Sequence, residues 1–161
     1  MSQTSQTTTI QKLPPSLNIK EEELKIRAMT SDDINFVAAS WLNSYKVESQ
    51  FAFRIPRPIF FKGHGLIINH ILQKPTTEGI VLHFHEVPDL ILAYMVLENI
   101  KPKPVVHYLY VKGRFRNLGF AKRLIIHTKI DPTDMWFTHW TYPMNEIIKK
   151  IPGSIYNPYA L

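Results

Sequence analysis

The sequence predicts a single mixed α/β (α+β) domain in which helices flank a twisted, mixed β-sheet. Three observations favour this class. Alternating apolar residues at 24–29 are followed by an amphipathic helical pattern. Two apolar runs, 79–86 and 90–99, flank a short turn and predict a β-hairpin. A β-branched and aromatic run at 105–111 precedes a basic turn and a second amphipathic helix.

The chain of 161 residues is long enough for one domain with a sizeable core. Its first residues are rich in Ser, Thr and Gln and include the pair Pro14-Pro15, so they bury too little apolar surface to offset the entropy of ordering. We therefore expect a flexible tail over residues 1–18 and a single folded domain over residues 19–161.

The folded part is expected to begin with a strand and a helix. Leu24, Ile26 and Ala28 alternate with charged residues, as in a strand that is buried on one face. Thr30 or Ser31 can cap the following helix. The buried face of that helix is expected to carry Ile34, Val37, Trp41 and Tyr45.

Residues 46–62 are expected to form a loop that is rich in aromatic and basic side chains and is broken by two prolines. Phenylalanines interleaved with arginines either pin a long loop to the core or stack on a flat ligand, and both interpretations stay open. A second helix is expected over residues 64–73, although Gly63 and Gly65 disfavour helix at its start.

In the second half of the domain, Val87-Pro88-Asp89 is the expected turn of the hairpin. His83 and His85 project from the same side of the first hairpin strand, but no third ligand can be assigned, so no metal site is predicted. The remaining elements expected are a strand, a short helix and an extended segment, over residues 135–141, 144–151 and 154–161.

The net charge of +6 favours anionic partners such as a nucleotide cofactor, nucleic acid or an acidic protein surface. Because the basic residues are dispersed, nucleic-acid binding is permitted rather than indicated. The chain has no cysteine, which excludes a disulfide scaffold, a thiolate nucleophile and a thiolate zinc site. The sequence shows neither a secretory signal pattern nor an apolar run of membrane-spanning length, so we expect a cytoplasmic protein without membrane contact.

The strongest functional signal lies in residues 105–128. After the apolar strand, Lys112, Arg114 and Arg116 fill a tight turn, and Gly119 precedes the next helix. The first amides of a helix have no internal partner and lie at the positive end of its dipole. A glycine at that point lets an anion approach the backbone closely. This arrangement predicts a pyrophosphate site.

This stretch resembles the central motif of the GNAT superfamily, the N-acetyltransferases that use acetyl-coenzyme A. The family pattern, Arg/Gln-x-x-Gly-x-Gly/Ala, is met by Arg116-Asn117-Leu118-Gly119-Phe120-Ala121. Tyr110-Val111 matches the end of the apolar strand that precedes the motif in the family. Residues 26–33, followed by an amphipathic helix, are similar to the opening strand and first helix of these proteins.

The resemblance implies that acetyl-coenzyme A is the acyl donor. Its pyrophosphate would lie on the amides of residues 116–121, and its pantetheine arm would run beside residues 109–111 as an added strand would. Lys112 and Arg114 would help at the 3′-phosphate, and the loop 46–62 would line the acceptor pocket. The cofactor-binding residues so implied are Leu109, Tyr110, Val111, Arg114, Arg116, Asn117, Leu118, Gly119, Phe120, Ala121 and Lys122.

The implied reaction is direct attack of a primary amine on the thioester, which needs a general base and a proton source for the departing thiolate. His107 is the expected base because histidine titrates near neutrality and some members carry a functional histidine at the matching strand position. A buried histidine with satisfied hydrogen bonds is the alternative interpretation of His107, and Glu98 is a second candidate base. The tyrosine that serves as the acid in many members is replaced here by Pro152. Tyr142 and Tyr156 are the phenols that could supply the proton instead.

Three classes of function stay open. We favour an acyl-coenzyme A-dependent N-acyltransferase whose acceptor amine, on a small molecule, a protein or a nucleobase, is unidentified. The replaced tyrosine supports a GNAT-like binding module without turnover, and the aromatic and basic residues of 46–62 support a nucleic-acid-binding or nucleic-acid-modifying protein. The short C-terminal part predicts an acceptor side that is either open or completed by a second subunit in a homodimer.

Overall fold

The computed structural model describes residues 18–161. The predicted tail, residues 1–18, lies outside the described residues except for its last residue. A short 3-10 helix, Glu21–Glu23, leads into the first strand.

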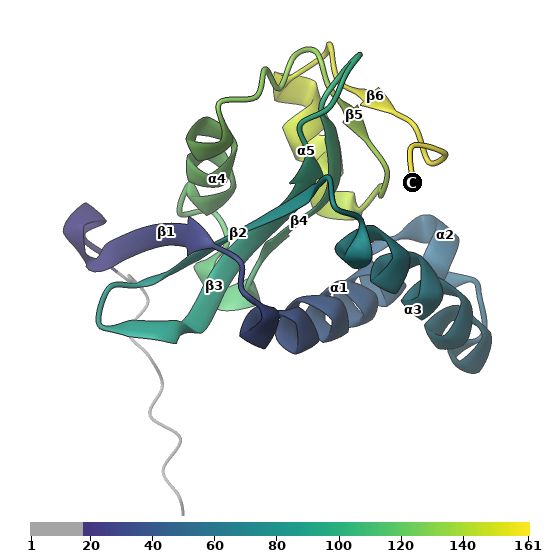
Figure 1. The fold of residues 1–161 in the computed structure, drawn as a ribbon, viewed down its shortest axis with the longest axis horizontal. Helices are drawn as coiled ribbons and strands as arrows, with labels where there is room; N and C mark the ends of the chain where they lie inside the picture. The colour runs from purple at the N-terminus through teal and green to yellow at the C-terminus, as the bar shows by residue number, and fades with distance from the viewer. Residues whose placement is uncertain (1–17) are drawn as a thin grey trace, which may run out of the picture.

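One six-stranded sheet forms the centre of the molecule, with its strands in sequence order from β1 to β6 (Figure 1). The strands are β1 (Leu24–Ala28), β2 (Thr77–Phe84), β3 (Val87–Glu98), β4 (Val105–Val111), β5 (Trp136–Phe137) and β6 (Ile155–Tyr156). The three pairings among β1 to β4 are antiparallel, whereas β5 runs parallel to β4 and β6 parallel to β5. This mixed sheet confirms the predicted fold class.

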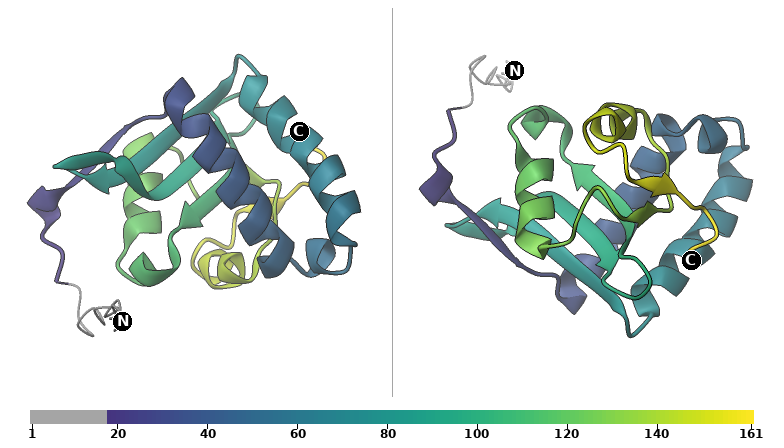
Figure 2. Two further views of the ribbon diagram at one scale, coloured as in Figure 1. Left: turned by 90° about the horizontal axis from the view of Figure 1, so that it is seen from below. Right: turned by 90° about the horizontal axis from the view of Figure 1, so that it is seen from above.

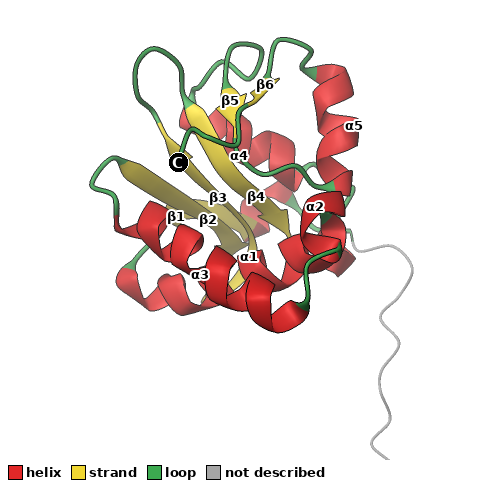
Figure 3. Cartoon of the chain, turned by 90° about the vertical axis from the view of Figure 1, so that its right-hand side faces the viewer, coloured by secondary structure: helices red, strands yellow, loops and turns green. Residues whose placement is uncertain are grey.

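Helices cover both faces of the sheet (Figures 2 and 3). The helices of one face are α1 (Ile34–Glu48), α2 (Gln50–Phe53) and α3 (Arg57–Gln73), and those of the other are α4 (Phe120–Thr128) and α5 (Tyr142–Lys150). The core is divided accordingly into two apolar clusters, one beneath α1 and α3 and one beneath α4 and α5. Alternation of side chains along β2, β3 and β4 supplies apolar residues to both clusters, as expected for strands buried on both faces.

Tyrosines attach α1 to the sheet. Tyr94 of β3 and Ser40 of α1 share a hydrogen bond of 3.0 Å, and Tyr108 of β4 and Ser44 share one of 2.7 Å. Trp41 stacks on Tyr108 with ring centroids 4.9 Å apart. The predicted buried face of α1 is confirmed at Val37, Trp41 and Tyr45, while Ile34 at the helix start is 36% exposed.

The prediction of a loop over residues 46–62 is wrong. α1 continues to Glu48, the short α2 follows, and α3 begins at Arg57 rather than at residue 64. The two prolines do not break a helix here, because Pro56 is the N-cap of α3 and Pro58 lies in its first turn, where a missing amide hydrogen costs nothing. Phe60 is buried and packs in the core, as one interpretation predicts, whereas Phe51 and Phe53 are exposed. Stacking on a flat ligand stays a prediction.

Two smaller predictions are corrected as well. The hairpin turns at residues 85–86, and the expected turn Val87-Pro88-Asp89 forms the start of β3, with Val87 paired to Phe84. The strand expected over residues 135–141 shortens to the two residues of β5, because the chain beyond it leaves the sheet to enter α5. His83 is buried and bonds the carbonyl of Phe84, whereas His85 lies beyond the end of β2 and is exposed.

Within residues 18–161, no group of three or more His, Cys, Asp or Glu side chains is placed to hold a metal ion. Across the same described part of the chain, none of the helices combines the length and the apolar character that crossing a membrane requires.

Candidate active site

The site begins where β4 and β5 separate. The two strands pair only through Val105 with Trp136 and Val106 with Phe137. The last ladder bond runs from Thr138 N to Val106 O at 3.1 Å. Beyond this point no strand within residues 18–161 lies beside this edge of β4, and the space is bounded instead by α4 and α5.

A bulge at His107 determines how that free edge is presented. Val96 of β3 pairs with Tyr108, but the next residue, Leu97, pairs with Val106, so His107 is an extra residue in β4. Every side chain after the bulge therefore changes face: Val106 packs beneath α4, whereas Tyr108 packs beneath α1. The backbone groups change side in the same way.

The amides of Leu109 and Val111 consequently point into the gap. Lys112 N donates to Leu92 O at 2.8 Å, which places the backbone groups of Tyr108 and Tyr110 toward β3 in this alternating ladder. Leu109 and Val111, between them, face away from β3 toward the missing strand. Except for the carbonyl of Val111, which accepts from Arg116, these backbone groups form a template on which an extended ligand can lie as a strand does.

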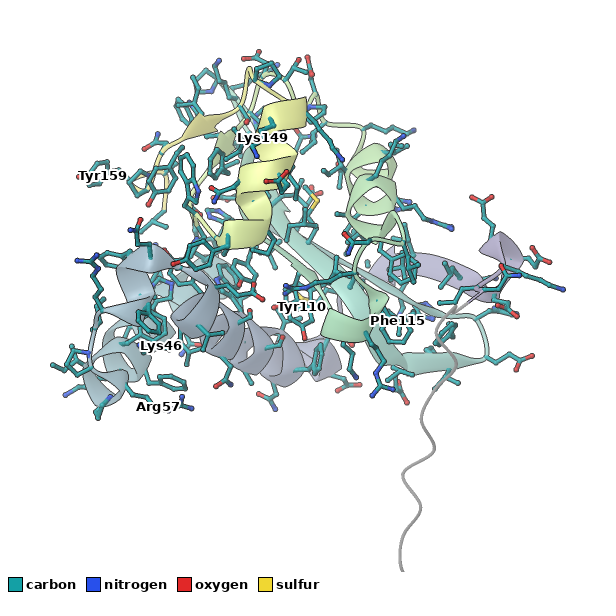
Figure 4. All side chains as sticks on the ribbon, turned by 180° about the vertical axis from the view of Figure 1, so that it is seen from behind. Lys46, Arg57, Tyr110, Phe115, Lys149 and Tyr159 are labelled. Atoms are coloured by element: carbon teal, nitrogen blue, oxygen red, sulfur yellow. The ribbon has the colours of Figure 1, made fainter. Side chains whose placement is uncertain are left out.

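A cleft of about 840 Å³ follows the free edge. Figure 4 shows this side of the molecule, with α5 and α4 standing apart above Tyr110 and Phe115. The lining comes from β4, the loop after it, and the facing sides of α4 and α5. Of the predicted cofactor residues, those that line the cleft are Leu109, Tyr110, Val111, Arg116, Asn117, Gly119, Phe120, Ala121 and Lys122.

The start of α4 forms one end of the cleft. Gly119 is its N-cap with φ +80°, a left-handed conformation that glycine adopts without strain. The first helical hydrogen bond runs from Arg123 N to Gly119 O at 3.1 Å, so the amides of Phe120, Ala121 and Lys122 are not used within the helix. In the part of the chain that the structure describes, no side chain caps them. This end of the cleft is therefore suited to an anion.

The basic side chains at the cleft are only partly those predicted. Arg116 donates to Val111 O at 3.2 Å and pairs with Glu48 at 2.5 Å, so its guanidinium joins the loop to α1. Lys122 lines the cleft, and Lys150 at the end of α5 lines it from the opposite side. Arg114 and Leu118 lie outside the lining, as does Lys112, and their predicted roles stay predictions.

The predicted bases, Glu98 and His107, form a buried pair. Their side chains are at most 1% exposed, and His107 Nε2 lies 2.8 Å from Glu98 Oε2. Lys74 donates to Glu98 at 2.7 Å, and Thr76 donates to its other oxygen. Burial alone would raise the pKa of Glu98, but the hydrogen bonds from Lys74, Thr76 and His107 outweigh it and lower the pKa to about 2. Glu98 is thus an ionised partner that orients His107.

The other nitrogen of His107 is also bonded. His107 Nδ1 lies 3.1 Å from Thr138 Oγ1, which lies 2.8 Å from His139 Nδ1. His139 Nε2 in turn lies 2.8 Å from Nε2 of His64 on α3. Burial lowers the pKa of His107, and the hydrogen bond and charge of Glu98 only partly offset this. Burial lowers the pKa of His64 to about 4 and that of His139 well below its usual value.

The predicted phenols lie elsewhere. Tyr142 begins α5 and is 54% exposed, and Tyr156 packs on Phe137 and Trp140. Neither lines the cleft, and burial raises the pKa of Tyr156. Their roles as proton sources stay predictions.

Sequence reasoning missed His64, Thr138 and His139. No local pattern marks them, because His64 and His139 are 75 residues apart in the chain and meet only in the folded core. Lys150 was missed for the same reason: a basic residue near a helix end is typical of a solvated helix terminus, and only the packing of α5 places it at the cleft.

Comparisons by sequence identify no relative: no protein-family model matches this chain, and a search of curated proteins found no match. Comparisons by structure do. A candidate acetyl transferase from Pyrococcus furiosus, 13% identical, matches with a TM-score of 0.54 over 84% of this chain and 82% of its own. A GCN5-related N-acetyltransferase from Ralstonia eutropha JMP134, also 13% identical, matches with a TM-score of 0.52 over 83% and 82%.

The PaiA N-acetyltransferase from Thermoplasma acidophilum in complex with coenzyme A is a weaker match. It is 14% identical, and its TM-score is 0.48 over 66% of this chain and 69% of its own. The two stronger matches extend over most of both chains. The chain therefore has the fold of the GNAT superfamily, as its central motif predicts.

Proposed function

We propose that this protein is an N-acyltransferase that takes an acetyl group from acetyl-coenzyme A and passes it to a primary amine. The observation that carries the proposal is the cleft, whose lining includes both the free edge of β4 and the uncapped start of α4. An extended, amide-containing arm with a pyrophosphate at one end requires both features together.

The residues of the cleft fit such a donor. The amides of Leu109 and Val111 would bond the pantetheine arm, and the amides of residues 120–122 would bond the pyrophosphate. Lys122 and Lys150 lie close enough to the cleft to add positive charge for the remaining phosphate. The bound donor supplies an activated acyl thioester, and the chain supplies orientation and proton transfer.

The site for the amine would lie at the inner end of the cleft. A small cavity there shares Tyr108, Leu109 and Thr141 with the main cleft, and His107 and His139 are in its wall. Titratable side chains at the inner end are what amine deprotonation requires. This correspondence favours an enzyme over a module that only binds coenzyme A.

Calorimetric titration of acetyl-coenzyme A into wild type and two variants of Gly119 tests the proposal. Asp and Asn both tolerate the left-handed conformation, and a Cβ at this position meets no atom within 4 Å. Gly119→Asp places a negative charge beside the pyrophosphate site, whereas Gly119→Asn is its neutral match. We expect micromolar binding by wild type, a loss of about tenfold or more in Gly119→Asp and a much smaller loss in Gly119→Asn.

Equal affinities in Gly119→Asp and Gly119→Asn would show that no phosphate lies at α4. No binding by folded wild type would remove the proposed function. Binding without acetylation of any amine, tested with aliphatic diamines, lysine peptides and peptides with free α-amino groups, would favour the binding module instead.

A further inference from the structure

The helices α1, α2 and α3 carry almost no negative charge. Residues 34–77, which contain all three, include one of the 13 acidic residues of the chain, Glu48. Glu48 pairs with Arg116 and lines the cleft, so it does not neutralise the outer surface of these helices. The exposed lysines and arginines of this stretch, which pair with no carboxylate among residues 18–161, are Arg54, Arg57 and Lys62.

Large apolar side chains project from the same helices. Within residues 18–161, eight such side chains are more than half exposed, and three of them are Ile126, Tyr142 and Tyr159. The other five all lie in residues 47–66 and are Val47, Phe51, Phe53, Ile59 and Leu66. Each of these five is at least 60% exposed, so folding leaves most of its surface in water. Clustered exposure of this kind marks an interaction surface.

The end of α1, α2 and the start of α3 meet at one corner of the molecule. Figure 1 shows α2 and α3 at its right-hand end, and Figure 4 shows Lys46 and Arg57 far from Phe115. Lys46 joins the three helices, because its Nζ donates to the carbonyl oxygens of Ala52 and Phe53, at 3.0 Å each, and lies 5.9 Å from the ring centroid of Phe60. The exposed side chains of α2 are thus held beside those of α3.

Helical spacing brings the outer residues of α3 together. Ile59, Lys62 and Leu66 follow one another at intervals of three and four residues, so they share one exposed face of the helix. The opposite face carries the buried Phe60 and His64. The five exposed apolar side chains of residues 47–66, together with Arg54, Arg57 and Lys62, form the corner patch.

We propose that the corner patch binds the surface of a membrane that contains anionic lipids. Its apolar members would enter the boundary between headgroups and acyl chains, and its three cations would lie beside lipid phosphates. Exposed aliphatic and aromatic side chains match the hydrocarbon, and cations without carboxylates match the negative surface. The proposal does not depend on acyltransferase activity.

The chemistry of the patch favours lipid over two other occupants. Nucleic-acid bases stack on aromatic side chains, whereas Val47, Ile59 and Leu66 have no ring to offer them. In a symmetric contact between two copies of the chain, the three cations of one patch would face those of the other and repel. Hydrocarbon accepts aliphatic and aromatic side chains alike, and anionic headgroups attract the cations.

Binding at the corner patch leaves the donor cleft accessible from water, because residues 49–77 contribute nothing to the lining of the cleft. The proposal departs from the expectation of a protein without membrane contact. That expectation depends on the lack of an apolar run of spanning length in the sequence. Surface binding depends instead on side chains that only the folded helices bring together.

Co-sedimentation of the full chain with lipid vesicles tests the proposal. We expect wild type to bind vesicles of equal parts phosphatidylcholine and phosphatidylglycerol about tenfold or more tightly than vesicles of phosphatidylcholine alone, since each cation near an anionic surface contributes about fivefold. Arg54→Gln and Lys62→Gln should each weaken binding to the mixed vesicles by about fivefold. The double variant Phe51→Ser with Phe53→Ser should weaken it about tenfold or more.

Two exposed residues outside the patch supply matched controls. Ile126 on α4 is 64% exposed, about as much as the two phenylalanines, and Lys25 of β1 is an exposed lysine. Ile126→Ser and Lys25→Gln should bind the mixed vesicles as wild type does. Circular dichroism establishes that each variant is folded.

A label that senses polarity gives a second readout, which does not require the loss of binding. The chain has no cysteine, so a thiol introduced by Phe51→Cys or Ile126→Cys is the single site for an environment-sensitive dye. On mixed vesicles the emission of the dye at position 51 should shift to shorter wavelength, whereas that of the dye at position 126 should not.

Each contrary result assigns the patch differently. No binding of folded wild type to the mixed vesicles, equal binding by the patch variants, or the same emission shift at both labels would overturn the proposal. Tighter binding to duplex DNA than to the mixed vesicles, lost in the phenylalanine variant, would assign the patch to nucleic acid instead. A dimer that this variant dissociates in sedimentation equilibrium would assign it to a second copy of the chain. None of these results bears on the donor cleft, which the Gly119 variants test separately.

Discussion

At the scale of single residues, Glu98 shows how burial and bonding determine a role that residue type alone leaves open. A carboxylate near the end of a strand is typical of a solvated position, and it is also a reasonable general base. In the fold its two oxygens accept from Lys74, Thr76 and His107, and the side chain is 1% exposed. A carboxylate so well bonded holds a proton poorly, so it serves to fix the tautomer and charge of its neighbour.

Glu98 should make stability depend on pH in a defined window. Its pKa is about 2 in the folded state against 4.5 as the ordinary value, so its ionised form stabilises the fold above pH 4.5, and this contribution is lost as the pH falls toward 2. The difference corresponds to a free energy of unfolding on the order of 3 kcal/mol. Urea unfolding at a series of pH values should show this loss in wild type and its absence in Glu98→Gln.

Glu146→Gln is the matched control for this measurement. Glu146 pairs with Lys149 on the exposed surface of α5, and water screens the pair. Its removal should leave the pH dependence as in wild type. The same slope below pH 4.5 in Glu98→Gln as in wild type would assign the acid lability to other carboxylates, such as Asp33 with its partner Arg27.

At the scale of elements, α3 forms in spite of its sequence. Gly63 and Gly65 each disfavour helix, which is the reason for placing its start too late from sequence. The structure shows what outweighs them: Phe60, His64 and Ile68 form a buried stripe at helical spacing that packs against α1. Burial of that stripe lowers the free energy of the folded state by more than the two glycines raise it. The helix therefore extends across both glycines.

Replacing these glycines should therefore stabilise the protein. A Cβ at Gly63 or Gly65 meets no atom within 4 Å, and neither position has a positive φ. Gly63→Ala and Gly65→Ala should each raise the free energy of unfolding by about 0.5–1 kcal/mol, because alanine loses less backbone entropy in a helix. Denaturant midpoints at constant slope provide the measurement.

Gly153→Ala is the contrasting variant. A Cβ there would lie 1.7 Å from the carbonyl oxygen of Thr133, so the backbone would have to move and the variant should be clearly destabilised. Loss of stability in Gly63→Ala would show that the exposed surface of α3 is constrained by more than helix propensity.

At the scale of the whole molecule, the separation of β4 and β5 connects the donor cleft on one face with the histidines on the other. The bulge at His107 lies at this junction and gives the edge of β4 its free amides. Binding of the donor should consequently affect the amides along β4. It should also raise the free energy of unfolding of the whole fold, since a ligand that binds only the folded state stabilises it.

Hydrogen exchange with and without acetyl-coenzyme A tests this connection. We expect slower exchange at the amides of Leu109 and Val111 and at the start of α4, because the ligand would bond the groups that now lack partners. At a concentration 100 times the dissociation constant, the free energy of unfolding should rise by about 2.7 kcal/mol. For a tenfold loss of affinity in Gly119→Asp, the rise at the same concentration should fall to about 1.4 kcal/mol. Protection confined to α1 and α3 would place the donor on the wrong face of the sheet.

The sequence by itself determined the fold class, the strand 105–111 to the residue, and the glycine at the start of α4, because each depends on local spacing and backbone conformation. It also singled out His107 and Glu98. Only the tertiary structure decided that these two are a bonded pair, that the bulge turns Leu109 and Val111 outward, and that His64 and His139 complete a chain across the core. The physical reason is that hydrogen bonding, burial and the pKa of a side chain depend on atoms brought together from distant parts of the chain, and residue spacing carries no record of those atoms.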